Sequence, residues 1–178
     1  MYQNQIAKKG EILTETKKYV MSGKDKLIAA YILIGFLIQF FMLFFFCNWA
    51  NLDIVMYLGF LCLAISAILI LLSYILKKEG EMEEEKGFVT TKLVDTGIYG
   101  VVRHPIYLSL AYLFIGFALI SQHPLSLFLG FTMVLLCYYY MIEEEKLTIE
   151  KFGEEYLHYM NKVPRSNLLL GIWRVFKR

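Results

Sequence analysis

Two long runs of apolar residues near the start of the chain most constrain its fold. Residues 27–46 form a twenty-residue run whose strongly polar member is Gln39, and residues 54–76 form a longer run in which only Ser66 and Ser73 are clearly polar. A helix needs about 20 consecutive apolar residues to cross the hydrocarbon core of a bilayer. Both runs are therefore predicted to be transmembrane helices.

Two further apolar runs, residues 106–120 and 125–142, are shorter. The first would rise only about 22 Å as an α-helix, less than the roughly 30 Å of a bilayer core. We expect both to be helices that thin the bilayer locally or pair as a hairpin shielded by the first two. With 58% hydrophobic residues, the chain is predicted to be an all-α integral membrane protein with about four transmembrane helices, two long and two shorter.

The basic residues indicate which side of the membrane each loop faces. All 18 Lys and Arg residues lie before residue 27, between residues 77 and 103, or after residue 142, whereas residues 47–53 and 121–124 contain none. Because loops rich in Lys and Arg remain in the cytoplasm, both termini and the central loop are predicted to be cytoplasmic. This bias accounts for the basic residues without nucleic acid, so no nucleic-acid partner is expected.

The chain contains no internal repeat and no long Pro- or Gly-rich linker. We therefore divide it into a cytoplasmic N-terminal lead, residues 1–26, and a single membrane domain, residues 27–178. Beyond residue 142 the sequence is polar, but apolar residues recur at helical spacing. They are Ile149, Phe152, Tyr156 and Tyr159. This pattern predicts a cytoplasmic amphipathic helix near the C-terminus.

Several kinds of site are excluded by the residues present. The cysteines and histidines are dispersed, without the paired spacing of a zinc site or a disulfide framework, so no metal is expected. These residues are Cys47, Cys62, Cys137, His104, His123 and His158. Neither a GxxxxGK nor a GxGxxG motif is present, which argues against kinases, ATPases and ordinary dinucleotide-binding domains.

The stretch "TGIYGVVRHPIYLSL", residues 96–110, places Arg103 and His104 at the edge of the third apolar run. Ionisable residues in such positions usually have a partner or a function. Pro105 suits a first helical turn, and the free N–H groups of that turn together with Arg103 would favour an anion. Glu144 and Glu145, at the end of the fourth run, would accept from an ammonium group or a ribose diol. A zwitterionic or nucleoside-like ligand would fit between these basic and acidic residues.

The segments "TGIYGVVRHPIY" and "EEKLTIEKFGEEYLHYMNKVPR", residues 96–107 and 144–165, appear in the same order in a known family. With an RHPxY element, a Glu-Glu pair and a tail ending in VPR, residues 93–165 resemble the isoprenylcysteine carboxyl methyltransferase family. The related phospholipid methyltransferases share the short membrane helices and the glutamate pair. The resemblance therefore identifies the superfamily better than the methyl acceptor.

The resemblance implies methyl transfer from S-adenosyl-L-methionine, bound from the cytoplasm, to a lipophilic acceptor that enters from the bilayer. It implies catalytic roles for Arg103, His104, Glu144 and Glu145. The cofactor-binding residues that it implies are Gly97, Tyr99, Arg103, His104, Tyr107, Glu144, Glu145, Tyr156, Tyr159 and Arg165.

The acceptor remains open at this point. A carboxylate would attack already ionised, as in isoprenylcysteine carboxyl methylation, whereas an amine would need a base such as His104, Glu144 or Glu145. Phospholipid amines and other small lipophilic acceptors are alternatives. A catalytically silent scaffold and a nicotinamide-dependent membrane reductase are the competing classes. The sequence does not predict the oligomeric state.

Overall fold

The computed structural model describes residues 23–82 and 93–177, and all regular structure in them is helical. The elements are α2 (Gly23–Phe45), α3 (Asp53–Met82), η1 (Gly97–Gly100), α4 (Pro105–Ser121), α5 (Pro124–Phe152), α6 (Glu154–Lys162) and α7 (Leu168–Phe176). The described residues from 35 onward form one compact unit, which carries the candidate site, and the described residues before 35 belong to another. Most of the predicted N-terminal lead lies outside the described residues.

Among residues 23–82 and 93–177, three helices are long and apolar enough to cross a membrane, namely the stretches Lys26–Phe45, Asp53–Ile75 and Pro124–Phe152. The predictions of an all-helical chain and of an integral membrane protein are thereby confirmed. The prediction that the fourth run forms a shorter helix is wrong, because α5 has 29 residues. It continues past the apolar run through Glu143, Glu144 and Glu145, which are good helix formers. The helix α4, with 17 residues, is the short one.

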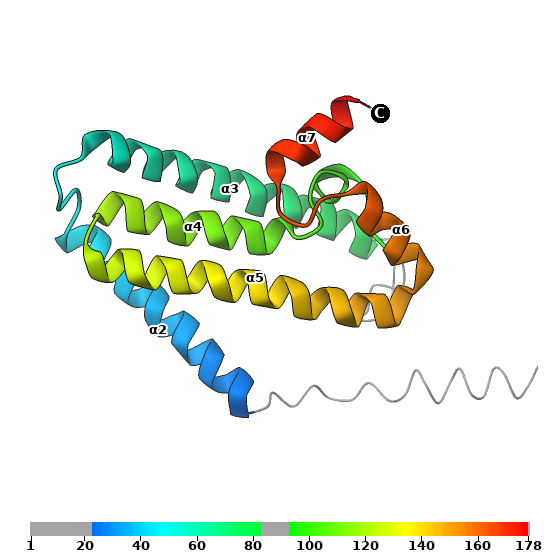
Figure 1. The fold of residues 1–178 in the computed structure, drawn as a ribbon, viewed down its shortest axis with the longest axis horizontal. Helices are drawn as coiled ribbons and strands as arrows, with labels where there is room; N and C mark the ends of the chain where they lie inside the picture. Colours follow the sequence, from blue (N-terminus) through cyan, green and yellow to red (C-terminus); the bar gives the residue numbers. More distant parts are fainter. Residues whose placement is uncertain (1–22, 83–92, 178) are drawn as a thin grey trace, which may run out of the picture. The chain divides into compact units, whose positions relative to one another are not determined.

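Helix α4 packs between α3 and α5 (Figure 1). Its contact with α3 is close because Gly59 and Gly116 face each other, and a Cβ on Gly116 would lie 3.0 Å from the Gly59 carbonyl oxygen. Farther along the same interface, Ser66 Oγ donates to the Ser109 carbonyl at 2.8 Å. Small residues and interhelical hydrogen bonds of this kind hold membrane helices together.

The connection between α4 and α5 is tied to the one between α2 and α3. Gln122 has a left-handed φ of 57° and ends α4. Its side chain donates from Nε2 to the Leu52 carbonyl at 2.8 Å and accepts from the Leu52 N–H at 3.2 Å. This end of the bundle is therefore held together by hydrogen bonds between a side-chain amide and the backbone of the neighbouring connection.

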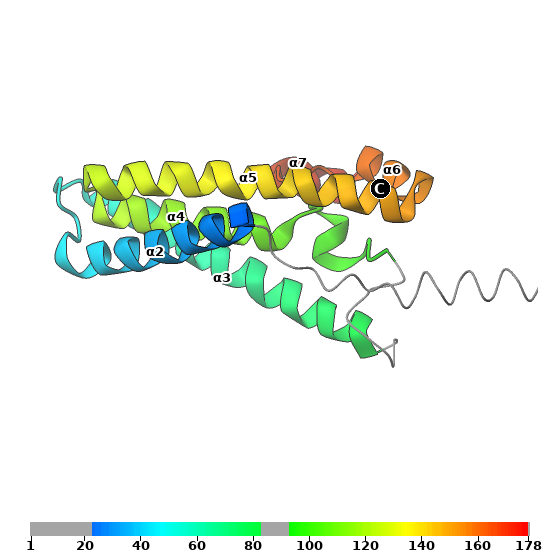
Figure 2. The ribbon, with the colours of Figure 1, turned by 90° about the horizontal axis from the view of Figure 1, so that it is seen from below.

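At the other end of the bundle, α3 diverges from α5, and the segment that contains η1 lies between them (Figure 2). The chain enters α4 at Pro105, as predicted. Gly153, with a φ of 57°, ends α5 and separates it from α6.

The predicted amphipathic face is thus divided between two helices. Tyr156 and Tyr159 form a buried cluster with Val163, against which Ile149 and Phe152 pack. The tail also contains a third helical element, α7, that the sequence pattern did not predict.

Candidate active site

The loop that leads into α4 is held in place by the C-terminal tail. Gly97 opens η1 with a φ of 58°, a conformation that suits glycine. The Arg103 N–H then donates to the Pro164 carbonyl at 3.0 Å, and the His104 N–H donates to the Arg165 carbonyl at 3.4 Å. The RHP element and the VPR element, far apart in the sequence, therefore lie side by side.

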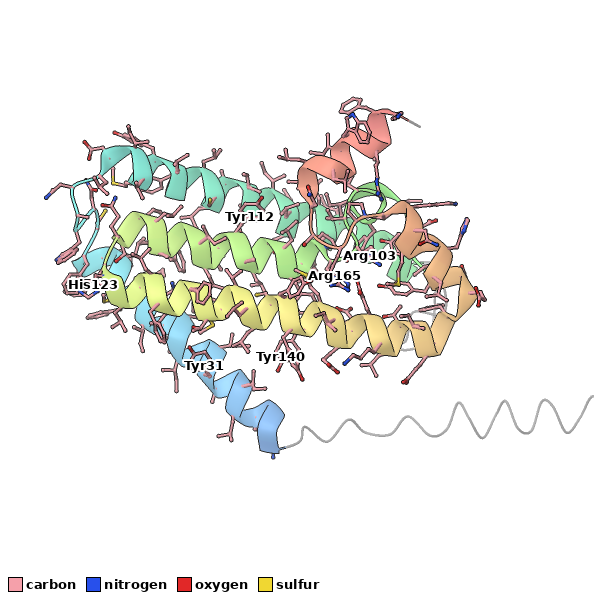
Figure 3. All side chains as sticks on the ribbon, viewed as in Figure 1. Tyr31, Arg103, Tyr112, His123, Tyr140 and Arg165 are labelled. Carbon is pink, nitrogen blue, oxygen red and sulfur yellow. The ribbon has the colours of Figure 1, made fainter. Side chains whose placement is uncertain are left out.

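Glu145 on α5 is the centre of a buried cluster of charged side chains, and its own side chain is 4% exposed. Arg165 donates from Nε to both carboxylate oxygens at 3.0 and 3.1 Å, and from Nη2 to Oε2 at 2.6 Å. Arg103 Nη2 lies 3.2 Å from Oε1. Figure 3 shows Arg103 and Arg165 together at one end of the bundle and His123 at the other. A single carboxylate thus joins α5, the start of α4 and the tail.

His104 lies between the two glutamates and is itself buried. Its Nε2 is 3.1 Å from Glu145 Oε1, and its Nδ1 is 3.5 Å from Glu144 Oε2. An ionised carboxylate only accepts hydrogen bonds, so each glutamate can accept one from the ring nitrogen that faces it when that nitrogen carries a proton.

Two adjoining cavities open next to this cluster. The larger has a volume of 340 Å³, and its lining residues are Leu93, Val94, Tyr99, Arg103, His104, Ile106, Glu144, Thr148, Lys151, Phe152, Tyr156 and Tyr159. The smaller has a volume of 230 Å³, and its lining residues are Tyr99, Arg103, His104, Pro105, Ile106, Tyr107 and Glu144. The first volume is within the range of small-molecule sites. Both cavities share Arg103, His104 and Glu144 in their walls, so these residues lie at the boundary between the two spaces.

Arg103 has unused hydrogen-bonding capacity in these walls. Its side chain is 8% exposed, with one nitrogen paired to Glu145. Its Nε and Nη1 atoms are buried and have no partner among the described residues. Leaving donors of a buried cation unpaired is costly, so such atoms indicate a place for an anionic oxygen of a ligand.

Two buried tyrosines form the opposite wall of the larger cavity. Tyr159 donates its hydroxyl to the Tyr99 carbonyl at 2.6 Å, which links α6 to η1. Burial, with a smaller contribution from the Glu145 carboxylate, raises the pKa of Tyr156 to about 12. Burial also raises the pKa of Tyr159. Both phenols are therefore neutral at physiological pH, and the Tyr159 oxygen, whose proton is donated to Tyr99, can still accept a hydrogen bond.

The structure brings most of the predicted site residues together. Seven of them line one or both cavities: Tyr99, Arg103, His104, Tyr107, Glu144, Tyr156 and Tyr159. The other three line neither cavity: Gly97 shapes the loop, whereas Glu145 and Arg165 lie behind Arg103 and His104 in the ion-pair cluster.

The sequence analysis missed several lining residues. Thr148 and Lys151 follow Glu144 by four and seven residues, so they lie on the same face of α5. That spacing was available in the sequence. The apolar lining residues Leu93, Val94 and Ile106 carried no such signal, because their facing depends on how η1 and α4 pack.

Together, the apolar helices and the charged double cavity at one end of the bundle define an integral membrane protein with a candidate site for a polar ligand next to its membrane helices. Residues 54–155 match the model of the family described as phospholipid methyltransferase. The chain belongs to this family, and the resemblance found in the sequence is confirmed.

Two relatives share the region of the site. The protein-S-isoprenylcysteine O-methyltransferase of Saccharomyces cerevisiae is 44% identical over 73 residues, which are 40% of this chain and 30% of that protein. The Xenopus laevis protein of the same name is 40% identical over 74 residues, which are 40% of this chain and 25% of that protein. The similarity thus covers less than a third of either relative. No solved structure matches the chain significantly.

Proposed function

We propose that this protein transfers a methyl group from S-adenosyl-L-methionine to the carboxylate of a lipophilic acceptor. The observation that carries the proposal is Arg103, a buried cation at the boundary of two cavities with two nitrogen atoms that no described residue pairs. The names of the two relatives, both isoprenylcysteine O-methyltransferases, support a carboxylate as the accepting group.

The larger cavity suits the methyl donor. Glu144 and the hydroxyl groups of Tyr156 and Tyr159 offer partners for its ammonium and ribose groups. Leu93 and Phe152 provide apolar surface for its base. When bound, the donor supplies an activated methyl group on a sulfonium centre.

The smaller cavity, which adjoins the helix α4, suits the reacting end of the acceptor. Arg103 lines both cavities, so its Nε and Nη1 hydrogens would bind the carboxylate oxygens of the ligands there. A carboxylate is already ionised at neutral pH, so no side chain has to remove a proton. The contribution of the protein is then to align the reactants and exclude water.

A phospholipid amine is the second candidate acceptor, in keeping with the description of the family. The structural feature that favours it is His104, whose Nδ1 faces Glu144 at 3.5 Å and can accept a proton from an amine.

The orientation of the protein in the membrane is also part of the proposal. The end of the bundle that carries Arg103 would face the cytoplasm, as the distribution of Lys and Arg predicts.

The chemistry of the product separates the two acceptors. The purified protein in lipid nanodiscs is supplied with methyl-labelled S-adenosylmethionine and either S-farnesylcysteine with a blocked amino group or the matching carboxamide. We expect label in the first compound alone, and we expect base to release it as methanol, because methyl esters hydrolyse and N-methyl groups do not. Base-stable label in the phospholipid fraction would favour the amine, and absence of transfer to any acceptor would contradict methyl transfer.

A further inference from the structure

Helix α7 exposes an almost wholly apolar face. The four side chains on it, Leu169, Ile172, Trp173 and Phe176, are 81%, 40%, 56% and 86% exposed. At 3.6 residues per turn they lie within an arc of roughly 100°. Lys177 follows on one flank of this arc. Such a face is typical of a helix that lies in the interface of a bilayer.

The opposite side of α7 is fixed to the loop of the candidate active site. Gly171 is buried there, and a Cβ on it would lie only 2.1 Å from the Val101 carbonyl oxygen. The helix begins at Asn167, whose side-chain oxygen accepts from the Leu170 N–H at 2.9 Å. Figure 1 shows α7 leaving the three-helix bundle at an angle. Because one side is docked on Val101, the apolar side is directed away from the protein.

A shallow basic cleft lies between α6 and α7. It has a volume of 340 Å³, and its four lining residues are Asn161, Lys162, Arg174 and Lys177. Arg174 Nη1 donates to the Lys162 carbonyl at 3.2 Å, which ties the two helices together. Lys177 Nζ lies 5.0 Å from the centre of the Trp173 ring, so the cation and the apolar face adjoin. Within the described part of the chain, the lining consists of three basic side chains and the Asn161 amide, without a carboxylate.

We propose that this cleft binds the phosphate of an anionic phospholipid while the apolar face of α7 inserts among the acyl chains of the same leaflet. The juxtaposition of Arg174 and Lys177 with Trp173 carries the inference. A lipid offers a phosphate and hydrocarbon in that arrangement, whereas a soluble anion would use only the cleft. Because the membrane helices hold the protein in the bilayer, α7 lies close to a lipid surface. Basic residues near an anionic membrane favour binding of its lipid headgroups.

The chain contains two tryptophans, which makes a direct test possible. In a Trp49→Phe variant, Trp173 is the only source of tryptophan fluorescence. This variant is placed in nanodiscs of phosphatidylcholine that contain a minor fraction of brominated phosphatidylglycerol or, for comparison, of brominated phosphatidylcholine. Both lipids should quench Trp173, and the anionic one should bind at least fivefold more tightly. Absence of quenching by either lipid would overturn insertion of α7, and equal quenching would overturn the headgroup site.

Charge variants then locate the preference. Each basic residue near a membrane surface contributes about a fivefold preference for anionic lipid. Lys177→Gln, which removes no backbone hydrogen bond, should lower the preference about fivefold, and Arg174→Gln should do likewise. Lys146→Gln, at an exposed pair with Glu143 on α5, should leave it unchanged. If Lys146→Gln has the same effect as Lys177→Gln, the preference is a general charge effect and the proposal fails.

Inorganic phosphate separates a lipid from a free anion. If the cleft is a headgroup site, adding about 10 mM inorganic phosphate should reduce quenching by the brominated anionic lipid no more than sodium chloride of the same ionic strength does. Phosphate-specific displacement would show that the cleft binds free phosphate, and the lipid assignment would be wrong.

Discussion

Glu145 and Arg165 form a two-point ion pair, with Arg165 Nη2 at 2.6 Å from Oε2 and Nε at 3.0 Å from Oε1. The pair connects the end of α5 to the tail after α6. Because Arg165 takes both oxygens, Arg103 contacts Glu145 through a single nitrogen and retains two for other partners. The structural pair therefore leaves Arg103 available to a ligand.

Replacing Glu145 by Gln should destabilise the protein. The change leaves Arg103 and Arg165 without their shared anion, and breaking a buried ion pair costs about 3–5 kcal/mol. Arg165 is 28% exposed, which places the expected loss at the lower end of that range. The control is Glu143→Gln, which removes an exposed pair with Lys146 and should change stability by less than about 1 kcal/mol. Thermal unfolding in detergent distinguishes them, and equal midpoints would show that the cluster is not structural.

Gly171→Ala should lower methyl transfer more than it lowers stability. The new Cβ would displace α7 from Val101, two residues before Arg103, and misplacement by about 1 Å costs as much as a hundredfold in rate. We expect a ten- to hundredfold lower kcat/KM in protein that is still folded.

The matched control is Gly116→Ala, whose Cβ would lie 2.6 Å from Leu63 Cδ2 in the interface between α3 and α4. It should lower the unfolding temperature while leaving the kcat/KM of the folded protein unchanged. If Gly171→Ala retains the parental kcat/KM, α7 does not support the site.

The buried tyrosines predict how stability depends on alkaline pH. The pKa of Tyr156 is raised to about 12 in the folded protein, against about 10 in an unfolded chain. Between these values the unfolded state loses its proton first, so stability is complete below about pH 10 and falls as pH rises through about 12. The shift corresponds to about 2–3 kcal/mol. Denaturant unfolding between pH 8 and pH 12 should show this loss.

The loss should be smaller in Tyr156→Phe and unchanged in Tyr74→Phe, which removes an exposed phenol on α3. An identical pH dependence in Tyr156→Phe and the parent would contradict the assignment.

Much of this arrangement was predictable because it depends on local signals. Hydrophobic runs indicated the helices, and Pro105 indicated the start of α4. If the chain crosses the membrane and returns between residues 104 and 144, Arg103 and Glu144 must lie at the same end of the bundle, as they do.

What the sequence could not show is which of two adjacent glutamates faces the cavity. Neighbouring helical residues point about 100° apart, so packing alone turns Glu145 inward and Glu144 toward the cavity.

The tail was harder to predict. The helical spacing from Ile149 to Tyr159 correctly indicated residues that pack together, but Gly153 adopts a φ of 57° and divides them between two helices. Helix α7 has nine residues, too few for a clear periodic signal. Its position depends on the close approach of Gly171 to Val101, a contact that no local pattern reveals.

The most direct test of the central claim is the affinity of the purified protein for S-adenosylmethionine, measured by isothermal titration. Removing one charge-assisted hydrogen bond to a ligand costs about 1.5–3 kcal/mol, which is roughly ten- to a hundredfold in Kd. Arg103→Gln and Glu144→Gln should each weaken binding by that factor, and Glu144→Gln should do so without loss of stability because its side chain is 50% exposed. Lys146→Gln should bind as the parent does. Parental affinity in both cavity variants, or no binding by the parent, would contradict the account.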